Sequence, residues 1–245
     1  MRYAICFTPS PSDPLTFAAA SWLGRDIYSG REQEPPDGIK LSLQEHAFYT
    51  AIPRRFGFHA KLMAPFRMVS ETNEGALLRE LMCFASAIAP FSLPKLEVGK
   101  LGSHFGLYIS EPCEAVQNLA ADIVHTFSRY ADRSEQIKSS TTLLDGLSAA
   151  QLTNLMRWGD PFAMDEYRFQ MALTGPISPP HIAKTDCAIR TVFEPLLQAE
   201  VMVANIALLI EEGVGGPFLV HSLHPLGPID AHTKNGKQSK YRIAA

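Results

Sequence analysis

Residues 56–66, FGFHAKLMAPF, carry a histidine and a lysine two positions apart in a stretch that alternates like a β-strand. Residues two apart in a strand point to the same side, so His59 and Lys61 would reach one ligand together. An imidazole exchanges protons near neutral pH, and an ammonium group binds anions such as phosphate. The residue types and their spacing therefore predict acid–base chemistry on an anionic ligand, or binding of one.

A second segment, residues 167–177, has the same design and reads YRFQMALTGPI. In both segments a polar residue follows an aromatic one, the residue two positions later lies on the same face of the predicted strand, and a proline ends the run. Gln170 stands at the position of His59, and Ala172 stands at the position of Lys61. Glutamine donates and accepts hydrogen bonds but does not ionise, so Gln170 cannot act as a general acid or base.

The elements that must position these segments form a repeated pattern. We expect strands at 2–8, 56–66, 91–111 (two strands around a turn at 99–102), 166–177 and 199–227 (a hairpin around GVGGP). We expect helices within 12–30, 42–51 (ending before Pro53), 73–89, 113–131, 148–159 and 180–199.

This pattern predicts an α+β fold with two pseudo-symmetric lobes, each an antiparallel sheet covered by helices, and a central cleft. The lobes would span roughly 1–133 and 134–231 of a single domain at 1–231, and strands can exchange between them. Residues 232–245 carry several basic residues and little to bury, so we expect a mobile tail there.

The ordered set of segments resembles the 2H phosphoesterase superfamily, whose members carry two H-x-T or H-x-S motifs that face each other across a cleft. The resemblance runs from RYAICFTP through WLGRD, RRFGFHAKLMAPF, APFSLPKLEV and RWGDPF to YRFQMALTGPI and the final hairpin. It is strongest to the branch named for phosphonate metabolism, with motifs like GFHATLKAPF and FRFHMTLTG. It implies metal-free acid–base chemistry on a phosphodiester, with one imidazole as base and the other as acid.

The sequence departs from that family pattern at three of the four motif positions. His59 is kept, but Lys61 replaces a hydroxyl residue, Gln170 replaces the second histidine, and Ala172 replaces the second hydroxyl. A basic residue usual in the family is also missing at Met63, so the lysine is shifted by one step along the same face. Loss of one acid–base group costs about 10²- to 10⁴-fold in rate, so binding survives these changes better than catalysis.

Four further residues are candidates for ligand contact. Arg54 and Arg55 precede the first motif, although a solvated pair is the ordinary interpretation of both. Tyr3 lies on the first strand, where core packing is the alternative. His104, at the start of a predicted strand, is a candidate to replace the missing imidazole.

Composition excludes several other classes of protein. The 245 residues carry a formal net charge of −3 with 19% charged residues, which gives no field to hold a long nucleic acid. No apolar stretch approaches the eighteen or so residues of a membrane span, so we expect a soluble, cytoplasmic protein. No ligand cluster predicts a metal, and no cofactor is expected.

The sequence leaves two main hypotheses open for one small phosphate-bearing ligand, a nucleotide among the candidates. In the first, the chain is an active phosphoesterase in which His59 is the single acid–base group and Lys61 stabilises charge on the phosphoryl group. In the second, it is a pseudoenzyme that holds the ligand through His59, Lys61 and Gln170. A site refitted for another reaction is a third alternative.

Overall fold

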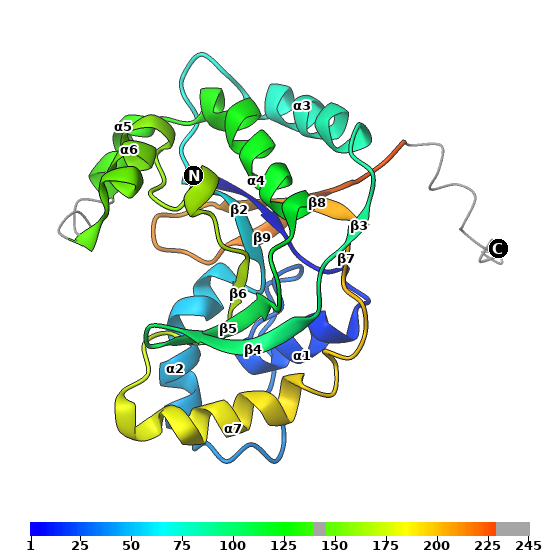
Figure 1. The fold of residues 1–245 in the computed structure, drawn as a ribbon, viewed down its shortest axis with the longest axis vertical. Helices are drawn as coiled ribbons and strands as arrows, with labels where there is room; N and C mark the ends of the chain where they lie inside the picture. The colour runs from blue at the N-terminus through cyan, green and yellow to red at the C-terminus, as the bar shows by residue number, and fades with distance from the viewer. Residues whose placement is uncertain (140–145, 229–245) are drawn as a thin grey trace, which may run out of the picture.

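The computed structural model describes residues 1–139 and 146–228, which form a seven-stranded sheet, a two-stranded sheet and covering helices (Figure 1). The strands are β1 (Arg2–Phe7), β2 (Ala60–Phe66), β3 (Phe91–Ser92), β4 (Leu96–Leu101), β5 (His104–Ile109), β6 (Gln170–Ala172), β7 (Met202–Val203), β8 (Asn205–Glu211) and β9 (Leu219–Pro225). The α-helices are α1 (Pro14–Leu23), α2 (Leu43–Phe56), α3 (Glu74–Ser86), α4 (Glu114–Phe127), α5 (Arg133–Ser139), α6 (Ala149–Trp158) and α7 (Ile182–Phe193). Short 3₁₀ turns are η1 (Ser128–Tyr130), η3 (Met164–Glu166) and η4 (Pro179–His181).

The large sheet has the order β4-β5-β6-β2-β1-β8-β9, and every pair in it is antiparallel. The predicted α+β class is confirmed. The two sheets expected from the sequence are joined into one, because the short strand β6 pairs with β5 on one edge and with β2 on the other. Strands from the two halves of the sequence interleave, since β6 lies between β5 and β2 while β8 and β9 extend from β1. The division into lobes stays a prediction, and the predicted tail lies outside the described residues.

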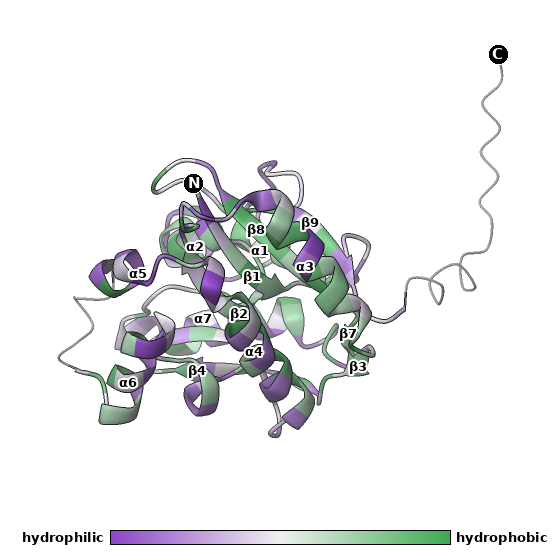
Figure 2. Cartoon of the chain, turned by 90° about the horizontal axis from the view of Figure 1, so that it is seen from above, coloured by the Kyte–Doolittle hydropathy of each residue, from purple (hydrophilic) through white to green (hydrophobic). Residues whose placement is uncertain are grey.

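The two faces of the large sheet have different environments. On the core face, alternate residues such as Ile5, Ala60 and Met171 are fully buried in one hydrophobic core with α1, α3, α4 and α7. The opposite face, called the cavity face here, carries the motif residues and a smaller cluster around Cys6 and Phe218. Figure 2 shows the central strands mainly in the hydrophobic colour, while the helices around them carry hydrophilic stripes.

Helix α2 forms one wall of the cavity, and it is longer than the sequence predicts. Ser42 and Glu45 make a capping box at its start, but the helix continues through Pro53 to Phe56, so the expected end before the proline is wrong. Proline has no N–H to donate to the carbonyl four residues back. That carbonyl, on Tyr49, instead accepts from the backbone N–H of Gly175 at 2.7 Å, which ties α2 to the segment after β6.

The β4–β5 hairpin also differs from the expected turn at 99–102. Leu101 pairs with His104, so the chain turns at Gly102 and Ser103, and Gly99 lies within β4. A side chain at Gly99 would approach the ring of Tyr108 to 2.8 Å, which explains a glycine inside this strand.

None of the helices in the described residues combines the length and the apolar character that crossing a membrane requires.

Candidate active site

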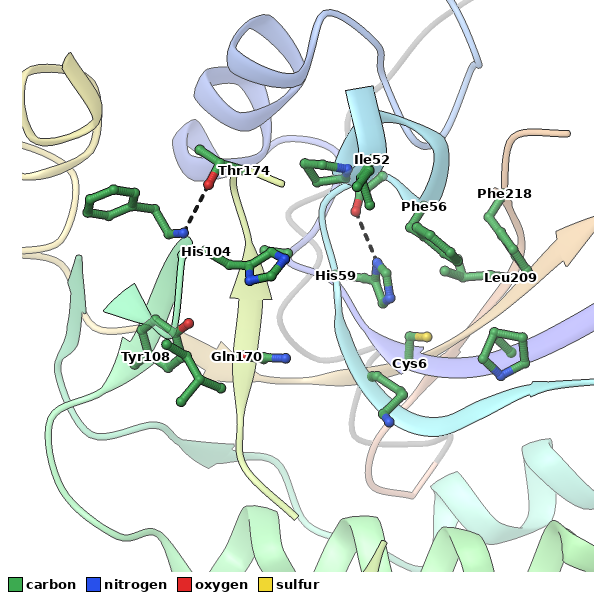
Figure 3. A pocket seen from close by; sticks show the side chains of 18 residues that line it. Cys6, Ile52, Phe56, His59, His104, Tyr108, Gln170, Thr174, Leu209 and Phe218 are labelled. Carbon is green, nitrogen blue, oxygen red and sulfur yellow. Dashed lines mark hydrogen bonds between the residues drawn. The ribbon is translucent and has the colours of Figure 1, made fainter. Parts of the chain in front are cut away.

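A cavity of about 370 Å³ opens on the cavity face where β2, β5 and β6 meet (Figure 3). Its size lies within the range of small-ligand pockets, and most of its lining is apolar. Four of the residues predicted as site residues line it together: His59, Lys61, His104 and Gln170. The structure thus brings residues from three separate parts of the sequence to one site.

His59 is held by the turn between α2 and β2. Gly57 ends α2 with φ 76°, a conformation that favours glycine, and a side chain there would collide with Ile27 at 2.5 Å. The carbonyl oxygen of Gly57 lies 3.0 Å from Nδ1 of His59. A carbonyl only accepts hydrogen bonds, so Nδ1 carries the proton and Nε2 keeps its lone pair in the neutral ring.

The protonation state of His59 favours a base. The side chain is half-buried, and burial lowers its pKa below the ordinary histidine value because a charged ring would lose hydration. The hydrogen bond to Gly57 opposes this shift, and the positive charge of Lys61 adds to it. His59 is therefore neutral at pH 7 and can accept a proton at Nε2.

Lys61 lies on the same face but already has a carboxylate partner. Its Nζ atom is 2.5 Å from Oδ2 of Asp160, a buried residue whose Oδ1 accepts from the backbone N–H of Phe162 at 3.0 Å. The ammonium group also lies 5.9 Å from the centre of the Phe162 ring. An anion that binds at Lys61 must therefore share the ammonium group with the carboxylate of Asp160 or displace that carboxylate. Sequence reasoning missed this partner, although Asp160 lies in the segment RWGDPF.

Gln170 and Ala172 lie on β6, which is the neighbour of β2 in the sheet. The pairing of Ala60 with Met171 sets Lys61 opposite Gln170 and His59 opposite Ala172 in the antiparallel register. Both residues of β6 are exposed, and the structure gives the Gln170 amide no hydrogen-bond partner among the described residues. The amide is free to donate to or accept from a ligand.

His104 reaches the cavity from β5. Gly106 pairs with Ala172 and Tyr108 with Gln170, so His104 lies further along the same face, beside the end of β6. Its side chain is exposed, and Figure 3 shows the strand of Gln170 running between the strands of His104 and His59. The cavity thus contains a second imidazole, but not at the position of the second motif.

The three other predicted residues do not line this cavity, and each has a partner elsewhere. Arg54 donates from Nε to the carbonyl of Leu23 at 2.7 Å. Arg55 pairs with Glu211, a buried carboxylate that also binds Arg2 and whose pKa these two arginines lower to about 2.

Tyr3 donates to Oε2 of Glu74 at 2.7 Å, and burial together with this carboxylate raises its pKa. These contacts hold β1, α2, α3 and β8 together around the site.

The rest of the lining was not predicted from sequence. Ile52 and Phe56 come from α2, Leu101 comes from the hairpin tip, and Phe218 precedes β9. Cys6 also lines the cavity, but burial raises the pKa of its thiol, which makes it a poor nucleophile. The periodicity of α2 did not indicate that this helix lines a cavity. The signal in its sequence is apolar residues at exposed positions, such as Ile52. No group of three or more histidine, cysteine or acidic residues among those described could hold a metal ion.

The fold and the cavity define an α+β protein with a cavity beside β2, β5 and β6 that His59 and His104 both line. Comparison with known families then places it: residues 61–219 match the model of "Protein of unknown function (DUF1045)", and the chain belongs to that family.

Two curated relatives carry the same name, "Ribose 1,5-bisphosphate phosphokinase PhnN". The protein of Janthinobacterium sp. (strain Marseille) is 35% identical over 175 residues, which cover 71% of this chain and 38% of the relative. The protein of Laribacter hongkongensis (strain HLHK9) is 28% identical over 218 residues, which cover 89% of this chain and 50% of the relative. The chain therefore spans half or less of the length of these relatives.

A solved structure described as "Crystal structure of phosphoesterase" aligns with a TM-score of 0.41 and 11% identity, over 92% of this chain and 98% of that one.

Proposed function

We propose that this protein hydrolyses a small cyclic phosphodiester, or a related phosphate or phosphonate ester, in the cavity of His59. The proposal follows the two-motif resemblance to 2H phosphoesterases, with one motif altered. One observation carries it: the bond from Nδ1 of His59 to the carbonyl of Gly57 leaves Nε2 as a proton acceptor in a pocket of ligand size.

The chemistry needs few groups. Nε2 of His59 takes a proton from water as the water oxygen bonds to phosphorus. The bond from phosphorus to the ring oxygen breaks, and this oxygen takes a proton from solvent or from His104. Lys61 and the Gln170 amide, which line the same cavity, then stabilise charge on the phosphoryl oxygens.

A second candidate function is binding without turnover. It is favoured by the pairing of Lys61 with Asp160 and by the non-ionising residues Gln170 and Ala172 on β6. Such a site would hold a phosphate-bearing ligand while lacking a positioned acid for the leaving oxygen.

The names of the curated relatives suggest which ligands to test first. Both are named for ribose 1,5-bisphosphate, so we propose ribose phosphates, their cyclic esters and nucleotides as the ligand class. The sequence holds no G-x-x-x-x-G-K-S/T phosphate loop, and we therefore propose no phosphokinase reaction for this chain.

The test is a pH–rate profile of the full chain on ribose cyclic phosphates and 2′,3′-cyclic nucleotides, with His59→Ala beside the wild type. We expect turnover that falls as the pH drops below the ordinary histidine range and that is lost in the variant. Turnover unchanged in His59→Ala would overturn the proposal. Calorimetric binding of the same compounds without turnover would favour the second candidate.

A further inference from the structure

A second cavity, of about 330 Å³, adjoins the first on the cavity face. The two share Lys61, Leu101 and Gln170, so a ligand that contacts these residues can extend from one cavity into the other. The remaining lining comes from α6, η3 and the segment leading into β6: Gln151, Phe162, Glu166, Tyr167 and Arg168.

The polar groups of the second cavity suit hydroxyl groups. Oε2 of Glu166 accepts from the amide of Gln151 at 2.9 Å, and its other oxygen has no hydrogen bond to the described residues. Arg168 donates from Nη1 to the carbonyls of Asp165 and Tyr167 at 3.1 and 2.8 Å, and its side chain forms no ion pair in the described part of the chain. A carboxylate oxygen and a guanidinium with spare donors thus lie in one cavity.

The lining carries the cations Lys61, which pairs with Asp160, and Arg168, together with the carboxylate of Glu166. This carboxylate would repel a phosphate placed directly beside it, whereas it readily accepts a hydrogen bond from a hydroxyl group. An apolar surface completes the site, because Phe162 is 44% exposed and Leu101 is 57% exposed. The C–H face of a sugar ring packs against such side chains.

We propose that the second cavity binds the sugar ring of a phosphorylated sugar whose phosphoryl group lies at His59. This inference rests on the proposed function, since it names the substrate class of the same site. Glu166 accepts a hydrogen bond from a ring hydroxyl, Arg168 donates hydrogen bonds to ring or hydroxyl oxygens, and Phe162 contacts the C–H face. The two cavities then divide recognition between a phosphate and its sugar.

The experiment compares calorimetric binding of orthophosphate and ribose 5-phosphate to the full chain. We expect the wild type to bind ribose 5-phosphate about tenfold or more tightly than orthophosphate, because a hydrogen bond to a charged group contributes about tenfold to a hundredfold in affinity. Glu166→Ala should lose most of that difference without changing the affinity for orthophosphate. Glu111→Ala, at an exposed carboxylate outside both cavities, is the matched control.

The outcomes separate this inference from the proposed function. Equal affinity of the wild type for both compounds, or an equal loss for both in Glu166→Ala, overturns the sugar site alone. Failure of the wild type to bind either compound overturns the proposed phosphate site and, with it, this inference. Should Glu166→Ala unfold, Glu166→Gln keeps the side-chain shape beside Gln151 and gives the same comparison.

Discussion

Strands β2 and β6 face one cavity from equivalent positions but carry different chemistry. His59, which directly precedes β2, bonds to the carbonyl of Gly57, and Lys61 on β2 pairs with the carboxylate of Asp160. On β6, Gln170 and Ala172 are exposed and carry no titratable group. Of these two strands, only β2 has a group beside it that can transfer a proton, while β6 can orient a ligand. Two strands of similar sequence design can thus divide catalysis and binding between them.

The largest effect should come from His59. Replacement by glutamine removes the proton acceptor, and we expect kcat on a cyclic phosphodiester to fall about 10²- to 10⁴-fold. Gln170→Ala should lower kcat less than about tenfold, because an amide only orients the ligand. Steady-state kinetics of both variants measure the contrast, and equal losses would contradict the division between the strands.

A smaller but opposite effect is expected when β6 is given an acid–base group of its own. The double variant Gln170→His, Ala172→Thr places an imidazole and a hydroxyl on the second motif strand. We expect kcat to rise about tenfold or more and the pH–rate profile to gain an alkaline limb from the new acid. Gln170→Asn with Ala172→Ser serves as the control without an imidazole. A profile unchanged in shape would show that this position does not reach the leaving oxygen.

The third test concerns Asp160, whose carboxylate forms an ion pair with Lys61. Asp160→Asn keeps the shape of the side chain but releases the ammonium, so orthophosphate should bind about threefold to tenfold more tightly. Titration calorimetry gives the affinities, and Asp165→Asn, an exposed residue of the following turn, is the control. Affinity that does not change in Asp160→Asn would exclude Lys61 as the phosphate contact.

The smallest effect is on the pH dependence of the free energy of unfolding. Burial lowers the pKa of His46, His59 and His224, so below about pH 6.5 the unfolded chain binds protons that the folded chain does not. Stability is thus full above that pH and decreases as the pH falls through it. Urea unfolding at about pH 8 and pH 5.5 measures the loss, and His59→Gln should reduce it. An identical loss in the variant would mean that His59 is not the group desolvated by folding.

The fold class followed from local patterns, because strand alternation and helix periodicity both report which side of an element is buried. The joining of the halves into one sheet did not follow, since the pairing of β6 with β2 depends on contacts between residues far apart in sequence. The length of α2 was also missed, because the loss of a hydrogen bond at Pro53 is balanced by Gly175, more than a hundred residues away. Helix α5 was not among the predicted helices, because its 7 residues are too few to show a periodicity.

The gathering of His59, Lys61 and Gln170 followed from the matching design of two segments. The partner of Lys61 did not, because a short polar segment such as that around Asp160 gives no sign of what it contacts. Arg54 and Arg55 stood out by charge and position, yet their donors are used to fasten α2 to its neighbours. Charge in a sequence therefore does not by itself indicate a ligand contact.

In residues 58–62 and 169–173, buried side chains alternate with side chains that face the cavity, and this has a consequence for substitutions. Their core-facing residues, Phe58, Ala60 and Leu62 on one side and Phe169, Met171 and Leu173 on the other, are almost fully buried and carry the packing. The positions between them can mutate without disturbing that packing. A substitution at His59, Lys61, Gln170 or Ala172 therefore changes the chemistry of the cavity while the scaffold persists.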